Sequence, residues 1–253
     1  IYQGSQEYPY RLVIQEAHLD AGLPSVFAAG AAVEVRIAGR GVAGKVDPAL
    51  QVDGQPLEWL TGKITAPATS PGFEGRWLRS PVSAATAGWE WRGPFVDGQP
   101  APRSRNPLFL ALAEDPVVAE VEPNDGGEQV QHVSPPCEIS GVFAKPGDVD
   151  VYRFTAKAGD LWWIEADAEA IGSSADPRFV LQKIQPNAAP RDEGEAEDTA
   201  DRGSAGRFFS GSADAALRKE IKEDGLYQIV LADLFNSQRG DVRLNYRLRI
   251  RKE

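Results

Sequence analysis

Residues suited to redox or nucleophilic chemistry are scarce in this sequence. It has no methionine, one cysteine and two histidines among 253 residues. Cys137 enters a strand-like segment beside Glu138, whose carboxylate disfavours a reactive thiolate, so we interpret it as a buried strand residue. His18 and His132 stand apart, outside any His-Glu-x-x-His pattern. There is also no Gly-x-Ser-x-Gly elbow and no phosphate-binding loop, so we predict that the chain is not an enzyme.

Basic patches and long apolar runs are lacking too. The formal net charge is −10, which argues against nucleic acid and anionic membranes as partners, because both attract clustered lysine and arginine. No apolar run approaches the roughly 18 residues of a membrane-spanning helix, so we predict no membrane insertion. The sequence opens inside a strand-like segment without a signal peptide, and we expect a targeting segment to lie upstream.

Turn-forming residues and period-two patterns dominate what is present. Glycine occurs 25 times and proline 19 times, and helix-type periodicity is rare, which favours short strands joined by many turns. The length suffices for two domains, so the predicted fold is all-β, with two β-sandwiches in tandem. Residues 32–39 alternate apolar and polar side chains, as a half-buried strand does. With further strands at 89–95 and 107–113, they predict an immunoglobulin-like β-sandwich over residues 15–116.

A second β-sandwich is predicted over residues 117–253. Residues 191–206 contain a run that is too polar to pack against a core, and we predict that this run is a mobile loop. The predicted strands of this sandwich are 137–143, 150–156, 161–168, 178–184, 225–233 and 242–251.

Oxygen-bearing side chains gather at the start of this second segment. An extended chain points residues i and i+2 the same way, so Glu122 and Asn124 can aim at one point. Hard cations such as Ca²⁺ bind about six to eight oxygens of this kind. From the residues alone, an acidic linker that ends in an Asn-Asp-Gly turn is an equal alternative. The oxygen-bearing residues are Glu120, Glu122, Asn124, Asp125, Asp148 and Asp150.

Five motifs follow one another through the same segment. They are Glu122-Pro123-Asn124-Asp125, Gly147-Asp148-Val149-Asp150-Val151-Tyr152-Arg153-Phe154, Ala158-Gly159-Asp160, Asp224-Gly225-Leu226-Tyr227-Gln228-Ile229 and Tyr246-Arg247-Leu248-Arg249-Ile250. In this order and spacing, the stretch from about 120 to 250 resembles the bacterial pre-peptidase C-terminal domain. The collagen-binding domains of bacterial collagenases belong to the same group. The resemblance implies a small jelly-roll β-sandwich, used as an accessory module of secreted proteases and other large extracellular proteins.

The resemblance also implies a cofactor. In the collagen-binding members, a Glu-x-Glu-x-Asn-Asp linker and a pair of aspartates near the first strands hold calcium. Carried over to this sequence, the implied cofactor is Ca²⁺. Its implied ligands are Glu120, Glu122, Asn124, Asp125, Asp148 and Asp150.

Residues 1–14 echo residues 234–250. Both stretches contain a Gly/Ser/Gln turn followed by a Tyr-Arg-Leu-x-Ile strand. We interpret residues 1–14 as the closing strand of a preceding copy of the module, which makes the chain a piece of a tandem array. Coincidence between two amphipathic strands is the alternative.

Aromatic residues form a second candidate site. Trp89 and Trp91 lie two residues apart and so face the same side of a strand, and sugar or peptide ligands stack on exposed flat aromatics. Tyr227 and Tyr246 lie where collagen-binding relatives carry surface tyrosines on late strands. The alternative is that these large side chains fill the sandwich cores.

These observations favour a non-catalytic, calcium-stabilised module of a larger secreted or cell-surface bacterial protein. Its expected partners are neighbouring modules of the parent chain. The alternative function is binding of polysaccharide or of a fibrous extracellular protein through the exposed aromatics.

Overall fold

The computed structural model describes residues 17–52, 54–70, 86–91, 93, 95, 96, 98, 106–199 and 212–253. In this part of the chain the regular structure is β-strand, with one short 3-10 turn, η2 (Glu169–Ile171), and no α-helix. The prediction of an all-β fold with β-sandwich layers is confirmed. No helix in these residues is long and apolar enough to cross a membrane. Residues 1–14, predicted to be the closing strand of another copy, lie outside the described residues.

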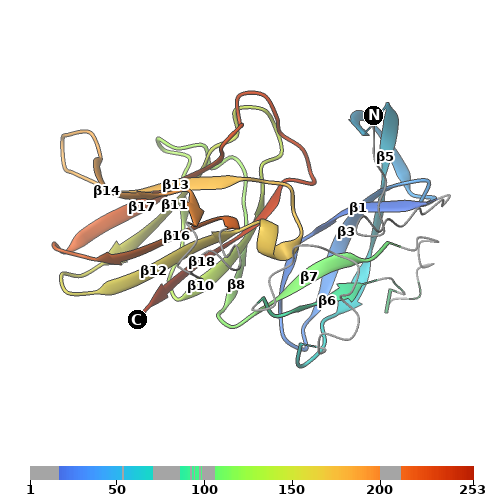
Figure 1. The fold of residues 1–253 in the computed structure, drawn as a ribbon, viewed down its shortest axis with the longest axis horizontal. Helices are drawn as coiled ribbons and strands as arrows, with labels where there is room; N and C mark the ends of the chain where they lie inside the picture. Colours follow the sequence, from blue (N-terminus) through green and yellow to red (C-terminus); the bar gives the residue numbers. More distant parts are fainter. Residues whose placement is uncertain are drawn as a thin grey trace, which may run out of the picture.

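The first set of strands forms two small sheets (Figure 1). One is a four-stranded antiparallel sheet in the order β1-β3-β5-β4, and the other is a three-stranded sheet in the order β2-β7-β6, in which β2 runs parallel to β7. Apolar side chains such as Phe27, Ile37 and Leu110 form a shared core. The strands are β1 (His18–Leu23), β2 (Val26–Ala28), β3 (Ala32–Arg40), β4 (Lys45–Val52), β5 (Gln55–Thr65), β6 (Gly88–Trp91) and β7 (Leu108–Ala113).

The second set of strands forms two larger sheets that pack face to face. The six-stranded sheet has the order β15-β16-β12-β18-β10-β8, and the five-stranded sheet has the order β14-β13-β17-β11-β9. The strands are β8 (Val117–Ala119), β9 (Gln131–His132), β10 (Cys137–Val142), β11 (Asp150–Ala156), β12 (Leu161–Asp167), β13 (Pro177–Lys183), β14 (Arg191–Ala196), β15 (Asp198–Thr199), β16 (Ser212–Glu220), β17 (Gly225–Asp233) and β18 (Asn245–Lys252).

Period-two alternation explains how these sheets build a core. Along β18, Tyr246, Leu248 and Ile250 are fully buried between the sheets, and they meet Phe154 and Ile229 from the opposite sheet. Each strand predicted for this segment corresponds to an observed one. The division into domains at residues 14 and 116 and the immunoglobulin-like topology of the first set stay predictions.

Residues 191–196 of the polar run form a strand and not the predicted loop, while residues 200–206 of that predicted loop lie outside the described residues. β14 pairs antiparallel with β13, and Phe179 lies opposite Ala196. Ion pairs satisfy its polar side chains: Arg191 pairs with Glu223, and Glu193 pairs with Lys219. These partners lie far along the sequence, so a local polarity argument could not include them.

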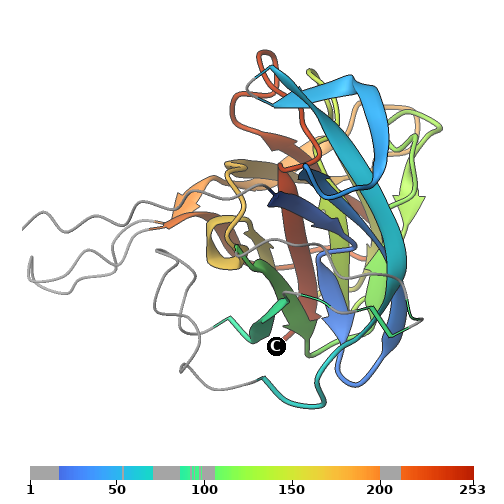
Figure 2. The ribbon, with the colours of Figure 1, turned by 90° about the vertical axis from the view of Figure 1, so that its right-hand side faces the viewer.

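The two sets of strands are in contact, and Figure 2 views the molecule with the first set in front. The backbone N–H of Ser25 donates to Ser140 Oγ across 2.9 Å, and the two hydroxyl oxygens lie 3.2 Å apart. A small apolar cluster covers the same contact and consists of Val26, Phe109, Ala111 and Ile171.

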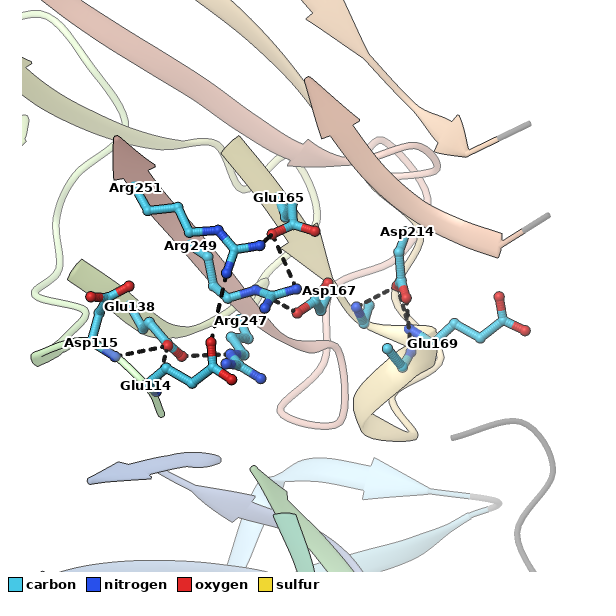
Figure 3. A network of polar contacts seen from close by, with 12 residues as sticks. Glu114, Asp115, Glu138, Glu165, Asp167, Glu169, Asp214, Arg247, Arg249 and Arg251 are labelled. Carbon is cyan, nitrogen blue, oxygen red and sulfur yellow. Dashed lines mark hydrogen bonds and ion pairs between the residues drawn. The ribbon is translucent and has the colours of Figure 1, made fainter. Parts of the chain in front are cut away.

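Charged residues on the outer face of the six-stranded sheet fix the segment between the two sets (Figure 3). Arg247 Nε donates to Glu138 Oε2 across 2.6 Å, and both side chains are almost fully buried. The other oxygen of Glu138 accepts the backbone N–H groups of Glu114 and Asp115 at 2.8 and 3.1 Å. Further along the same face, Arg249 pairs with Asp167 and Glu165, and Arg251 pairs with Glu165. We call these residues of β10, β12 and β18 the arginine ladder.

Candidate metal centre

Glu120 follows β8 directly and lies beside the end of β10. β8 runs parallel to β10, with Ala119 opposite Ser140, and the Glu120 N–H donates to Ser140 O across 3.2 Å. The Glu120 side chain then reaches forward, and its Oε2 accepts the N–H of Val142 at 3.0 Å. Strand geometry therefore sets the position of this carboxylate.

Two tyrosines hold Glu120 and Asp150 at the junction of the two sheets. Asp150 and Tyr152 lie two residues apart on β11 and both point inward. Tyr246 lies on β18 of the other sheet and contacts Glu120 Oε1 at 2.8 Å, Asp150 Oδ2 at 2.7 Å and the Tyr152 hydroxyl at 2.6 Å. Gly141 of β10 makes this placement possible, since a Cβ there would lie 2.3 Å from the Tyr246 ring.

Three carboxylates and one amide converge at this point. Each of Glu120, Glu122 and Asp150 offers an oxygen, and these oxygens lie within 4.8 Å of one another. The amide of Asn124, which is fully buried, lies 2.9 Å from Asp150 Oδ1 and 3.2 Å from Glu122 Oε2. With its nitrogen toward them it donates to both carboxylates; with its oxygen toward them it adds another oxygen to the group. We call these four residues the acidic cluster.

Burial makes the negative charges of this cluster costly. Burial, followed by the nearby charge of Glu120, raises the pKa of Asp150 to about 9. Burial also raises the pKa of Glu120, although hydrogen bonds from Tyr246 and the Val142 N–H oppose this rise. Among the described residues, no lysine or arginine forms an ion pair with Glu120, Glu122 or Asp150. The charge is therefore balanced either by protons or by a cation.

Asp125 and Asp148 are not brought into the acidic cluster. Both face Lys145: its Nζ lies 3.2 Å from Asp125 Oδ1 and 3.6 Å from Asp148 Oδ1. The other oxygen of Asp148 accepts the Ala144 N–H at 2.6 Å. Asp148 thus closes the turn before β11. The hydrogen bond to Asp125 raises the pKa of Lys145, and the charges of Asp148 and of Glu122 from the acidic cluster add to this rise.

The chemistry of the acidic cluster fits a hard divalent cation. Its donors are carboxylate and amide oxygens, which Ca²⁺ prefers, and it offers no thiolate or imidazole that a softer metal would need. The hydroxyls of Tyr152 and Tyr246 keep their protons, because burial raises the pKa of both well above the ordinary value. They therefore donate hydrogen bonds that orient the carboxylates.

The aromatic candidate site is corrected by the structure. Trp89 and Trp91 do face the same side of β6, but this side is the core of the first set, and the side chains are 8 % and 5 % exposed. Tyr227 and Tyr246 are buried between the sheets of the second set. Stacking of a ligand on these four rings is therefore wrong as a prediction. Tyr246 contributes to the acidic cluster instead.

Tyr152 and Lys145 are not among the predicted residues of this site, although both contact predicted ones. Tyr152 carries a usable signal, because it follows Asp150 by two residues in a strand and so shares its face. Lys145 carries none, because only the turn from 145 to 148, where Gly147 has a φ of +80°, brings its amine back to the aspartates.

Comparisons with known proteins give partial likenesses. No protein-family model matches the chain. A probable subtilase-type serine protease of Deinococcus radiodurans is 38 % identical over an alignment of 84 positions, which covers 31 % of this chain and 11 % of that protein. The chain thus spans only a small part of this relative.

Two solved structures resemble the fold weakly. The pre-peptidase C-terminal domain of a collagenase from Bacillus anthracis has a TM-score of 0.36 at 14 % identity, over 51 % of this chain and all of that domain. PliG of Aeromonas hydrophila, a periplasmic inhibitor of g-type lysozyme, has a TM-score of 0.34 at 16 % identity, over 55 % of this chain and 99 % of PliG.

Proposed function

We propose that this chain is a non-catalytic, calcium-stabilised accessory module of a larger secreted or cell-surface protein. The observation that carries the proposal is the acidic cluster, in which oxygens of Glu120, Glu122 and Asp150 converge and, among the described residues, none of the three forms an ion pair with a lysine or arginine. Carboxylates held together in this way repel one another, and a bound divalent cation removes the repulsion. A cation that binds the folded chain alone stabilises it by mass action.

The place of the cluster explains why a cation would matter to the architecture. Glu120 belongs to the segment between the two sets of strands, Asp150 begins β11 of the five-stranded sheet, and Tyr246 lies on the six-stranded sheet. One ion bound here would tie this segment to both sheets of the second set. The segment between the two sets of strands would then become more rigid, which would fix the second set relative to its neighbours in the parent chain.

An accessory role beside a protease agrees with the sequence likeness to a subtilase-type serine protease. The chain itself shows no triad in its sequence, and its two histidines lie in separate sets of strands. We therefore assign the chemistry of the parent protein to other parts of it, and to this chain a role in stability and positioning.

Thermal unfolding with increasing calcium tests the proposal. Chelator-treated protein should show a saturable rise in Tm as calcium is added. Glu122→Gln should largely abolish the rise, because it removes a charged ligand that is exposed and makes few other contacts. Asp125→Asn is the matched control: it lies three residues away, faces Lys145, and should keep the response.

Two results would contradict the proposal. One is a Tm that does not change with calcium in the wild-type protein. The other is an equal loss of response in Glu122→Gln and Asp125→Asn, which would indicate general screening of acidic surface and not a site.

A further inference from the structure

A second feature of the molecule lies on the outer face of the five-stranded sheet, away from its core. Here β14, β13, β17 and β11 lie side by side (Figure 1). A furrow with a volume of about 330 Å³ is open to solvent on this face. We call it the valine furrow. Its floor is formed by Val180 of β13 together with Val230 and Ala232 of β17, which are neighbours in register.

The side chains on either side explain why the furrow exists. Along one side runs a hydrogen-bonded row of long polar side chains, in which Arg153 donates to Gln228, Gln228 to Gln182, and Gln182 to Asp192. Along the other side stands Arg178, which lies opposite Ala232. The short apolar residues between these rows leave a channel that crosses the strands.

The two ends of the valine furrow differ in charge. Val149 and Asn236 close one end without a charge. Glu195 and Glu197 line the other end, and both are exposed. Arg178 lines the furrow as well, so its three charged lining residues, two glutamates and one arginine, together carry a net charge of −1. This end of the furrow therefore attracts a positive group.

We propose that the valine furrow binds an extended, basic segment of a partner polypeptide. Aliphatic side chains of such a segment would pack on Val180 and Val230, and a lysine or arginine would reach Glu195. An extended chain presents every second side chain to the same face, so a short alternating sequence meets both requirements.

The residues that line the furrow also favour a polypeptide over a polysaccharide as its ligand. Sugars bind to exposed aromatic rings, and the aromatic residue at the furrow, Phe179, is 1 % exposed with its ring in the core. The net charge of −10 favours a basic partner over an acidic one. The furrow does not include the acidic cluster, so this proposal stands independently of calcium.

A designed peptide tests the proposal directly. The probe is fluorescein-labelled Lys-Thr-Val-Thr-Val-Thr-Lys, which places lysine and valine on one face, and its counterpart has glutamate in place of lysine. Fluorescence anisotropy with the full chain at physiological salt should show saturable binding of the basic peptide and none of the acidic one. Glu195→Lys should weaken binding roughly ten-fold or more, since it replaces attraction by repulsion at the furrow end.

Matched variants keep the test specific. Glu34→Lys makes the same charge change on the exposed face of β3 in the first set and should leave binding unchanged. Val180→Thr keeps the shape of the floor but adds a hydroxyl, and it should weaken binding about three-fold. Thermal unfolding of each variant verifies that it is folded.

Three results would overturn the proposal. They are the absence of saturable binding of the basic peptide, equal weakening by Glu195→Lys and Glu34→Lys, and displacement of the peptide by a linear glucan oligosaccharide. Equal weakening by the two variants would mean that the peptide is attracted by the net charge of the whole chain and not by the furrow. Displacement by the oligosaccharide would mean that the furrow binds carbohydrate.

Discussion

The two faces of β18 solve the problem of buried charge in different ways. On the outer face, Arg247 and Arg249 each lie against carboxylates, so charge is balanced within the protein. On the inner face, Tyr246 offers only a hydroxyl to Glu120 and Asp150, and no lysine or arginine in the part of the chain that the structure describes forms an ion pair with either carboxylate. A balanced network needs no external partner, whereas the negative charge of the acidic cluster must be met by protons or by a cation. The arginine ladder is therefore structural, and the acidic cluster is the candidate binding site.

The largest expected effect on stability comes from breaking an ion pair of the arginine ladder. Arg247→Met should lower the free energy of unfolding by about 3–5 kcal/mol, because it leaves the carboxylate of Glu138 buried without its partner. Urea unfolding should give the same loss with calcium and with chelator. Arg251→Met is the control: its side chain is 35 % exposed, and its loss should stay below about 1 kcal/mol. A loss that depends on calcium would mean that the two faces are coupled.

The next largest effect on stability comes from removing a negative charge from the acidic cluster. With chelator, Asp150→Asn should be at least as stable as the wild type, because it removes a buried carboxylate whose pKa is raised by burial to about 9. With calcium at 100 times its Kd, the wild type should gain about 2.7 kcal/mol, and the variant should gain almost none. The free energies of unfolding of the wild type and the variant, each measured with chelator and with calcium, test this reversal of the order of stability. A variant that is less stable in chelator by as much as in calcium would assign Asp150 a structural role.

The pH dependence of Tm in the calcium-free protein further distinguishes the acidic cluster from the arginine ladder. The pKa of Asp150 is raised from its ordinary value of 3.8 to about 9 in the folded chain, so its protonated form belongs to the folded state. This contribution to stability is complete below the ordinary pKa and is lost as pH rises through about 9. In chelator, Tm should fall between pH 5 and pH 9, and the gain from calcium should grow over the same range. Asp150→Asn should flatten the curve, and a curve that keeps its slope in this variant would place the titrating group elsewhere.

The smallest effect is expected where a lysine already balances the charge. Asp125→Asn removes an exposed ion pair with Lys145, and it should change the free energy of unfolding by less than about 1 kcal/mol in either condition. Asp148→Asn should cost more in both conditions, because Asp148 accepts the Ala144 N–H in the turn before β11. If Asp148→Asn instead lost stability only with calcium, this residue would belong among the ligands.

The strands of the second set follow from local patterns. Alternation of apolar and polar residues along 137–140 and 245–251 fixes both the strands and the faces that they bury. The same reasoning failed for 191–196, where the polar side chains are satisfied by Lys219 and Glu223 from later strands. Local composition cannot show partners that are brought together only by the sheet.

The candidate site could be read from the sequence only in part. The spacing of Glu120, Glu122 and Asn124 does place three ligand-type side chains together, and Asp150 joins them from β11. Spacing did not show that Lys145 would take Asp125 and Asp148, because this depends on the fold of a turn.

Alternation had a similar limit for Trp89 and Trp91. It gave a shared face for the two rings correctly. It could not say whether that face looks toward the core or toward solvent, which is decided by the opposite sheet.

Calorimetric titration of calcium into the chelator-treated chain tests the central claim most directly. The unbalanced acidic cluster predicts saturable binding that is retained in Asp125→Asn and Arg251→Met and is lost in Asp150→Asn. Proton release on binding should accompany it, because the cation replaces a proton on the cluster. Absence of saturable binding in the wild-type chain, or undiminished binding in Asp150→Asn, would contradict the account.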